Sequence, residues 1–130
     1  MTSPTAVVLL VEGDIIIRHP LAEYLRECGF TVFEASNGDD AKRGLTTPTL
    51  QIDIVLADMA TEGSGFALQR WVRECGHPAE VILAGSVEKA VDRAGSICRK
   101  GPALTKPYKH HLVLDHIRRS LAQRNRGKVA

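Results

Sequence analysis

The sequence predicts an α/β domain built on a parallel sheet with helices on both faces. Five short apolar runs alternate with five helical patterns, the order typical of such domains. The first run is apolar on both faces, as expected of a strand covered on each side. Short connections favour right-handed crossovers in one doubly wound sheet. The 130 residues fit a single domain.

The first strand is expected at 6–11, where an apolar run ends at Glu12. A helix should follow at 15–28, because apolar residues recur there every three to four positions. Pro20 is expected to bend this helix or to mark an irregular first turn. Gly29 is a typical C-cap.

The middle of the chain continues the alternation of strands and helices. A strand is expected at 30–35, followed by turn residues in which Asn37 or Asp39 serves as N-cap. A helix is then expected at about 40–45. The next strand, at 53–58, is an apolar run with an acid at each end.

The third helix is expected at about 65–75, with its inward side formed by Phe66, Leu68, Trp71 and Val72. A strand at 79–84 stops at a glycine and a serine. A short helix is predicted at 87–94, with Ser86 as its cap.

The last strand is predicted at 102–105 and, because it begins with proline, at the edge of the sheet. The last helix is predicted at 110–123. The whole chain, 1–130, is then a single domain with a core at about 6–123 and a basic tail at 124–130.

The composition is that of a soluble globular protein, with 44% hydrophobic and 25% charged residues. A net charge of +2 indicates neither a nucleic-acid nor a membrane partner. No apolar stretch is long enough to span a bilayer, and no signal peptide is apparent, so we expect a cytoplasmic protein. Cys28, Cys75 and Cys98 are widely spaced and form no CxxC pair, which predicts three reduced thiols without zinc or a disulfide framework.

Chemically useful residues stand where the predicted strands end. Glu12 follows the first strand, Asp58 ends the third, Gly85 and Ser86 follow the fourth, and Lys106 follows the fifth. In a parallel sheet these ends lie at one edge, where open α/β folds bind ligands. Two carboxylates suit Mg2+, a lysine can hold a phosphate, and Asp58 between them can act as a nucleophile.

The sequence resembles a response-regulator receiver domain of bacterial two-component signalling, a CheY-like domain. The resemblance covers about 6–121 and is carried by the segments 8–12, 34–41, 53–58, 81–83 and 106–108. It implies the flavodoxin-like fold, a doubly wound five-stranded parallel sheet in the order 2-1-3-4-5. It also implies a phosphorelay in which a histidine kinase or a histidine phosphotransfer protein phosphorylates Asp58, with Lys106 as the phosphate partner.

The metal and switch positions depart from the family pattern. Gly13 stands where the second acid is usual, so Mg2+ should bind weakly, through Asp58, the Ala60 backbone carbonyl and a water-mediated Glu12. Asp14 is a further candidate ligand only if the turn is remodelled, and it otherwise suits the start of a helix. The switch hydroxyl position falls on Gly85, with Ser86 as its neighbour.

Two further departures concern the aromatic switch and the loop after Asp58. The aromatic switch position is Ala103, and Glu62 stands where a proline is usual. The degenerate metal and switch site leaves two hypotheses open.

In the first hypothesis, the chain is a stand-alone receiver phosphorylated on Asp58. It would signal through a downstream protein partner or a homodimer formed by the face of helix four, strand five and helix five. In the second, it is a pseudo-receiver, a constitutive protein-interaction module without phosphorylation. Neither hypothesis makes the chain an enzyme, beyond self-phosphorylation and dephosphorylation of Asp58.

Overall fold

The computed structural model describes residues 6–58 and 65–100. In chain order the elements are β1 (Val7–Val11), α1 (Ile15–Glu27), β2 (Thr31–Ala35), α2 (Gly38–Thr46), β3 (Ile54–Asp58), α3 (Gly65–Glu74), β4 (Glu80–Ala84) and α4 (Val87–Lys100). The predicted strand at 102–105 and the predicted helix at 110–123 lie outside the described residues. In the part of the chain that is described, no helix is long and apolar enough to cross a membrane.

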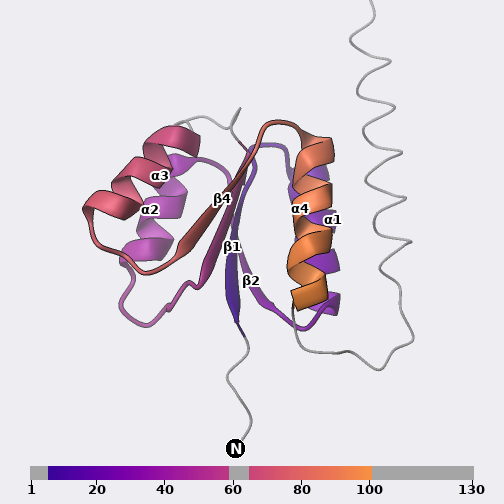
Figure 1. The fold of residues 1–130 in the computed structure, drawn as a ribbon, viewed down its shortest axis with the longest axis horizontal. Helices are drawn as coiled ribbons and strands as arrows, with labels where there is room; N and C mark the ends of the chain where they lie inside the picture. Colours follow the sequence, from indigo (N-terminus) through magenta and orange to yellow (C-terminus); the bar gives the residue numbers. More distant parts are fainter. Residues whose placement is uncertain (1–5, 59–64, 101–130) are drawn as a thin grey trace, which may run out of the picture.

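The four described strands form one parallel sheet in the order β2-β1-β3-β4. Val11 of β1 lies opposite Ala57 of β3, and Asp58 lies opposite Ala84 of β4. Helices cover both faces of the sheet, as Figure 1 shows. The prediction of a doubly wound parallel α/β sheet is therefore confirmed, and the order of its first four strands is the expected one.

Two apolar clusters fill the spaces between the sheet and its helices, because alternate strand residues point to opposite faces. On one face, Leu10 and Leu56 pack beneath α1 and α4. On the other, Leu9 and Val55 pack beneath α2 and α3. All four of these side chains are essentially inaccessible to solvent.

The ends of the first two helices follow local sequence signals. Asp14 is the N-cap of α1, since its Oδ1 accepts a hydrogen bond from the Ile16 amide at 3.0 Å. Gly29 follows α1 with a φ of 101°, a conformation that favours glycine. Asn37 caps α2 by accepting a hydrogen bond from the Asp40 amide at 2.8 Å, so α2 begins two residues earlier than predicted.

The predicted inward side of α3 is wrong at one position. Phe66 is 57% exposed, whereas Leu68 and Val72 are buried and Trp71 packs partly buried against the same cluster. The inward stripe runs through Gly65, Leu68 and Val72, and Phe66 lies about 100° around the helix from its first member.

The prediction of a short helix at 87–94 is also wrong, because α4 continues to Lys100. Ala90, Ala94 and Ile97 are buried at the spacing of one continuous helical face. Gly95 is tolerated inside this helix, where it faces the Tyr24 hydroxyl of α1; a Cβ at that position would lie 3.8 Å from the hydroxyl oxygen.

The cysteine prediction is wrong for two of the three thiols. Cys28, the C-cap of α1, forms a disulfide with Cys98 in the last turn of α4, with 5.3 Å between the two Cα atoms. Cys75 is a free thiol, as expected, and it is exposed. Wide spacing in the sequence did not reveal the pair, because the two helices meet only when both pack on the same face of the sheet.

The position of α4 has a topological consequence. The helix α1 connects β1 to β2 on one face of the sheet, and α2 and α3 connect β2 to β3 and β3 to β4 on the opposite face. All three are right-handed connections between parallel strands (Figure 1). Because α4 shares the face of α1, a parallel strand beyond β4 would require a left-handed connection, which is rare. Among the described residues, β4 pairs only with β3.

The disulfide should contribute strongly to stability, because it joins residues 70 positions apart. We expect its reduction to lower the free energy of unfolding by about 4 kcal/mol through the larger entropy of the reduced unfolded chain. Urea unfolding with and without a thiol reductant measures the difference. A Cys75→Ser background prevents thiol exchange in both samples, and equal unfolding midpoints would contradict the expectation.

Candidate functional site

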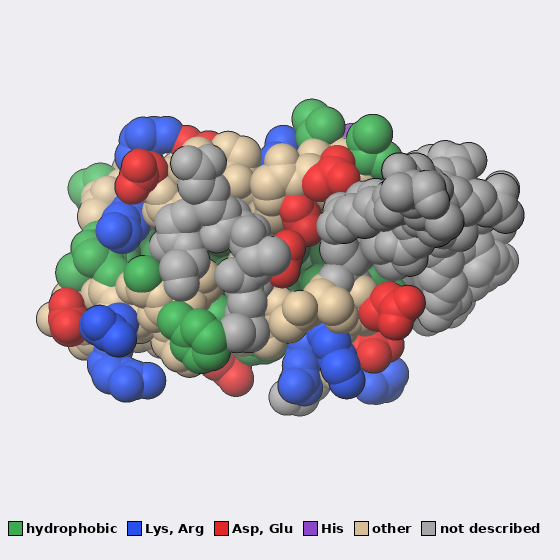
Figure 2. Space-filling view, turned by 90° about the horizontal axis from the view of Figure 1, so that it is seen from above, with side chains coloured by type: hydrophobic (Ala, Val, Ile, Leu, Met, Phe, Trp, Pro, Cys, Tyr) green, Lys and Arg blue, Asp and Glu red, His purple; other side chains and the backbone are tan. Residues whose placement is uncertain are grey.

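Two acidic side chains are buried at the carboxyl edge of the sheet. Glu12 directly follows β1 and is 6% exposed, and Asp58 ends β3 and is 9% exposed. Among the described residues, Glu12 and Asp58 are the only charged residues that are buried. The register of β1 and β3 brings them to the same level, one residue beyond the Val11 and Ala57 pair. Figure 2 looks down on the molecule from this edge, and acidic side chains gather near the centre of the view.

Glu12 is held in place by both its backbone and its side chain. Its amide donates to the Ala35 carbonyl at 3.0 Å, and its Oε2 accepts from the Asp14 amide at 2.6 Å. The Arg18 guanidinium donates to the Glu12 carbonyl at 3.0 Å and to the Glu34 carboxylate at 3.1 Å. The turn after β1 is therefore fixed to the first turn of α1 and to β2.

Arg18 is a site residue that the sequence analysis missed. It contacts Glu34 across 16 residues of sequence, and Arg26 donates to the same carboxylate. Nothing in the local pattern indicates this pairing, which requires α1 to lie beside β2. Hydrogen bonds from His19 and Arg18 and the nearby charge of Arg26 outweigh partial burial and lower the pKa of Glu34.

Burial raises the pKa of Glu12 from its ordinary 4.5 to about 7. The negative charge of Asp58 acts in the same direction, whereas the hydrogen bond from the Asp14 amide favours the charged form. A protonated Glu12 can donate a hydrogen bond to Asp58, an interaction that also raises the pKa of Glu12. The Glu12 carboxyl group therefore still binds a proton at pH values at which a solvent-exposed glutamate has lost it.

The donor set at this edge fits a hard divalent cation. Two buried carboxylates that repel each other are stabilised by a cation in the same way as by a proton, and carboxylate oxygens are the ligands that Mg2+ prefers. Ala60 and Lys106, the other predicted members of the site, lie outside the described residues. In the part that is described, no three His, Cys, Asp or Glu residues cluster as a metal site.

Gly13, Gly85 and Ser86 are the neighbouring positions at which the sequence departs from the receiver-domain pattern that it resembles. A Cβ at Gly13 would lie 3.5 Å from the Ser36 carbonyl oxygen, an ordinary contact, and a Cβ at Gly85 would meet nothing within 4 Å. Both positions therefore have room for a side chain. The Ser86 hydroxyl accepts a hydrogen bond from the Lys89 amide at 3.1 Å, so Ser86 caps α4, as predicted.

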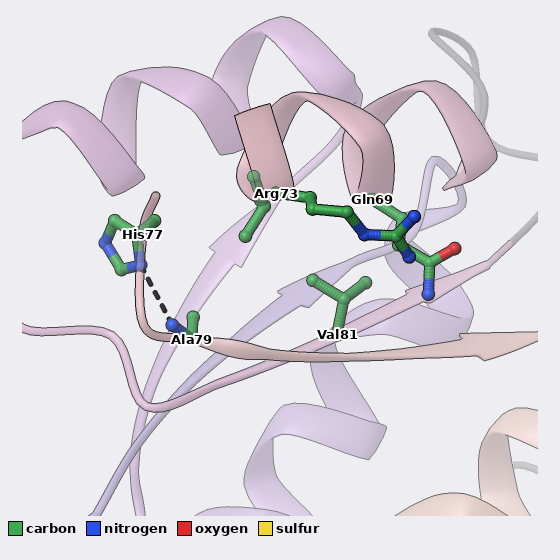
Figure 3. A pocket seen from close by; sticks show the side chains of 6 residues that line it. Gln69, Arg73, His77, Ala79 and Val81 are labelled. Carbon is green, nitrogen blue, oxygen red and sulfur yellow. Dashed lines mark hydrogen bonds between the residues drawn. The ribbon is translucent and has the colours of Figure 1, made fainter. Parts of the chain in front are cut away.

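A second hollow lies between α3 and β4, away from the two carboxylates. It has a volume of about 240 Å³ and is lined by Gln69, Val72, Arg73, His77, Ala79 and Val81. Figure 3 shows the Gln69 and Arg73 side chains reaching over Val81. The His77 Nδ1 accepts a hydrogen bond from the Ala79 amide at 3.1 Å, which orients the ring.

No protein-family model matches the sequence. The sequence is similar to a curated protein, a probable transcriptional regulatory protein of Picosynechococcus sp. (strain ATCC 27264 / PCC 7002 / PR-6). The two sequences are 30% identical over 113 residues, and the match covers 82% of this chain and 45% of the relative. The chain thus spans less than half of that relative.

Several solved structures have the same fold. The signal receiver domain of a putative Luxo repressor protein from Vibrio parahaemolyticus is 24% identical with a TM-score of 0.58, over 92% of this chain and 95% of that one. The chemotaxis response regulator CheY4 of Vibrio cholerae is 23% identical with a TM-score of 0.58, over 89% and 98%.

A third structure is the MaeR response regulator bound to beryllium trifluoride, which is 24% identical with a TM-score of 0.55, over 92% of this chain and 99% of that one. At these identities the matches establish the fold. The chain has the CheY-like fold of response-regulator receiver domains, as the resemblance implies.

The raised pKa of Glu12 predicts a pH-dependent stability. The folded protein holds a proton that the unfolded chain releases, so stability falls as the pH rises from about 4.5 to about 7. Glu12→Gln keeps an acceptor for the Asp14 amide and can donate to Asp58. Between about pH 5 and about pH 8, we expect the wild type to lose about 2–3 kcal/mol relative to this variant. Urea unfolding of both proteins at the two pH values measures the effect, and parallel pH profiles would refute it.

Proposed function

We propose that this chain is a response-regulator receiver in a phosphorelay and that Asp58 accepts the phosphoryl group. The observation that supports the proposal is the buried Asp58 carboxylate at the carboxyl end of β3, beside Glu12. A carboxylate in this position can reach a donor at the sheet edge while its surroundings exclude most water. The proposed donor is a phosphohistidine of a histidine kinase or a histidine phosphotransfer protein.

In the proposed step an Asp58 oxygen attacks the phosphorus of the donor phosphohistidine. A phosphorus–oxygen bond forms and the phosphorus–nitrogen bond breaks, and the electron pair returns to the donor imidazole. Lys106 is proposed to hold the phosphoryl oxygens. Apart from self-phosphorylation and later hydrolysis at Asp58, the chain itself carries out no reaction.

Glu12 and Asp58, with the Ala60 carbonyl and Asp14 as further candidates, are proposed to hold a weakly bound Mg2+. When bound, the cation would neutralise negative charge on the phosphoryl oxygens and the carboxylates. Glu12 must release its proton to take part, so cation and proton compete for the same pair of oxygens. Arg18, bonded to the Glu12 carbonyl, holds the turn that carries this ligand.

The proposed output is contact with a protein, either a downstream partner or a second copy of the chain. The surface proposed for it comprises α4, the predicted strand at 102–105 and the predicted helix at 110–123. Such a receiver would work in the cytoplasm of a bacterium, with neither nucleic acid nor membrane as the direct partner of this domain.

The alternative is a pseudo-receiver that binds a partner constitutively. One structural observation favours it: the Ser86 hydroxyl caps α4, and Gly85 has no side chain to contact a phosphoryl group. The missing hydrogen bond to a charged group is worth about 1.5–3 kcal/mol, so phosphorylation would stabilise a second conformation only slightly. Gly13 and Ala103 favour the same alternative.

The two functions differ in a phosphorylation assay. Incubation with a small-molecule phosphodonor and Mg2+ should add one phosphoryl group that hydroxylamine removes, because an acyl phosphate reacts with that nucleophile. Intact-mass spectrometry detects the adduct, and Asp58→Asn should abolish it.

Asp53→Asn is the matched control, because Asp53 directly precedes the first residue of β3 and Asp58 is the last. The Asp53 Oδ2 accepts a hydrogen bond from the Val7 amide at 2.8 Å. This variant should still be phosphorylated. If the wild type gains no phosphoryl group at any donor or Mg2+ concentration, the pseudo-receiver function holds and the phosphorelay proposal fails.

Restoring the missing acid should strengthen cation binding. Gly13→Asp places a third carboxylate beside Glu12, in a position with room for it. We expect Mg2+ affinity to rise by about tenfold or more, because a unit charge near 4 Å contributes about 4 kcal/mol before desolvation. Calorimetric titration with Mg2+ measures the affinity. Gln51→Asp, which adds the same charge before the start of β3, should leave the affinity unchanged; an equal gain in both variants would contradict a local site.

A further inference from the structure

A single guanidinium group joins the turn after β1 to the strand β2. Arg18 lies in the first turn of α1, where its amide donates to the Asp14 carbonyl at 2.7 Å. Its Nη1 donates to the Glu12 carbonyl at 3.0 Å, and its Nε donates to the Glu34 Oε1 at 3.1 Å. Because a planar guanidinium donates in fixed directions, these two bonds set where the Glu12 backbone lies relative to β2.

The Glu12 carbonyl lies at a point where the backbone needs such a donor. β1 ends at Val11, and Glu12 is buried directly after it. A buried carbonyl beyond the last strand residue costs free energy unless a donor satisfies it, and Arg18 is that donor. The Glu12 amide donates to the carbonyl of Ala35, the last residue of β2. Both polar backbone groups of Glu12 are therefore tied to β2, one directly and the other through Arg18.

The position of the Glu12 backbone decides where its carboxylate can reach. The Glu12 Oε2 accepts from the Asp14 amide at 2.6 Å, which confines the carboxylate to the turn. The same side chain interacts with Asp58. A rotation of the Glu12 backbone would disturb both interactions and change the distance between the two acids. Since Mg2+ requires a nearly ideal arrangement of its oxygen ligands, such a displacement weakens its binding.

The charge of Arg18 is compensated before any cation arrives. The Glu34 Oε1 pairs with Arg18, whereas the Glu34 Oε2 accepts from Arg26 at 3.3 Å and lies 3.2 Å from the His19 Nδ1. The Arg18 and Glu34 side chains are 14% and 20% exposed, so solvent and salt screen this pair little. The effect of Arg18 on the acid pair is therefore one of geometry more than of charge.

We propose that Arg18 is a positioning residue for the cation site of Glu12 and Asp58, and that its ion pair with Glu34 sets the Mg2+ affinity of that site. The inference rests on the proposed function, because it concerns the same cation. Loss of a group that orients a metal ligand typically weakens metal binding by about 10- to 100-fold. Arg18 acts through the Glu12 backbone and does not itself touch the cation.

Arg18→Lys tests the proposal, because it keeps the charge but replaces the planar group with an ammonium that cannot hold both acceptors in the same directions. Calorimetric titration of the full chain should give an Mg2+ affinity about tenfold lower than that of the wild type. Arg26→Lys is the matched control, since Arg26 binds Glu34 and the Val32 carbonyl in the same cluster. This variant should bind Mg2+ as the wild type does.

Glu34→Asp tests the same ion pair from its other side and keeps the proposal falsifiable if Arg18→Lys does not fold. The shorter side chain keeps the charge but withdraws the carboxylate from Arg18, so the Mg2+ affinity should again fall. Glu23→Asp is the control for this variant, because Glu23 accepts a hydrogen bond from Arg26 at 2.6 Å in the same cluster. It should leave the affinity unchanged.

Two further measurements separate positioning from a purely structural role. With a small-molecule phosphodonor, Arg18→Lys should need about tenfold more Mg2+ for half-maximal phosphorylation, while the rate at saturating Mg2+ stays near that of the wild type. Without any cation, the Glu12 and Asp14 amides should exchange hydrogen faster in Arg18→Lys than in the wild type, because the turn is less firmly held. In Arg26→Lys, both measurements should match the wild type.

Three outcomes would overturn the proposal. If the wild type binds Mg2+ and Arg18→Lys binds it equally well, the cation site stands and the role of Arg18 fails. An equal loss of affinity in Arg18→Lys and Arg26→Lys would also leave the cation site standing and remove the special role of Arg18. If the wild type binds no Mg2+, the proposed cation site itself fails, and the role of Arg18 fails with it.

Discussion

The parallel register of β1 and β3 is the constraint on which the rest of this site depends. It places Val11 opposite Ala57, so the next residues along the two strands are both acids and both buried. At the other end of the strands, the Asp53 carboxylate accepts a hydrogen bond from the Val7 amide and holds the same alignment. A slip of one residue would turn every strand side chain to the opposite face and separate the two acids.

Burying two carboxylates together is costly, and the structure shows how the cost is reduced. Burial raises the pKa of Glu12 to about 7, so Glu12 can take up a proton and the pair need not carry two negative charges. Arg18 stabilises the turn from outside, through the Glu12 carbonyl, and its charge is already paired with Glu34. The pair can therefore exchange a proton for a cation, and the proposed phosphoryl transfer to Asp58 depends on that exchange.

The four described strands, the acids at their ends and the caps at Asn37 and Ser86 could be predicted from the sequence, because each is set by a few consecutive residues. The errors concern interactions between distant residues. Phe66 has the spacing of an inward residue, but the position of α3 over the sheet decides that Leu68 and Val72 are buried instead. Nothing near Cys28 indicates Cys98, and Arg18 meets Glu34 only after α1 has docked on the sheet.

The position of α4 illustrates why such features escape prediction. Its buried face offers two alanines, a valine and an isoleucine, and burying such side chains yields about 0.8 kcal/mol per methylene. The disulfide contributes about 4 kcal/mol, which is comparable with the whole of that packing. Packing and the disulfide both hold α4 on the face of α1, whereas a right-handed connection to a parallel strand beyond β4 would require α4 on the opposite face. A sequence pattern specifies that the helix has an apolar side, but the choice between faces depends on a balance of terms of similar size.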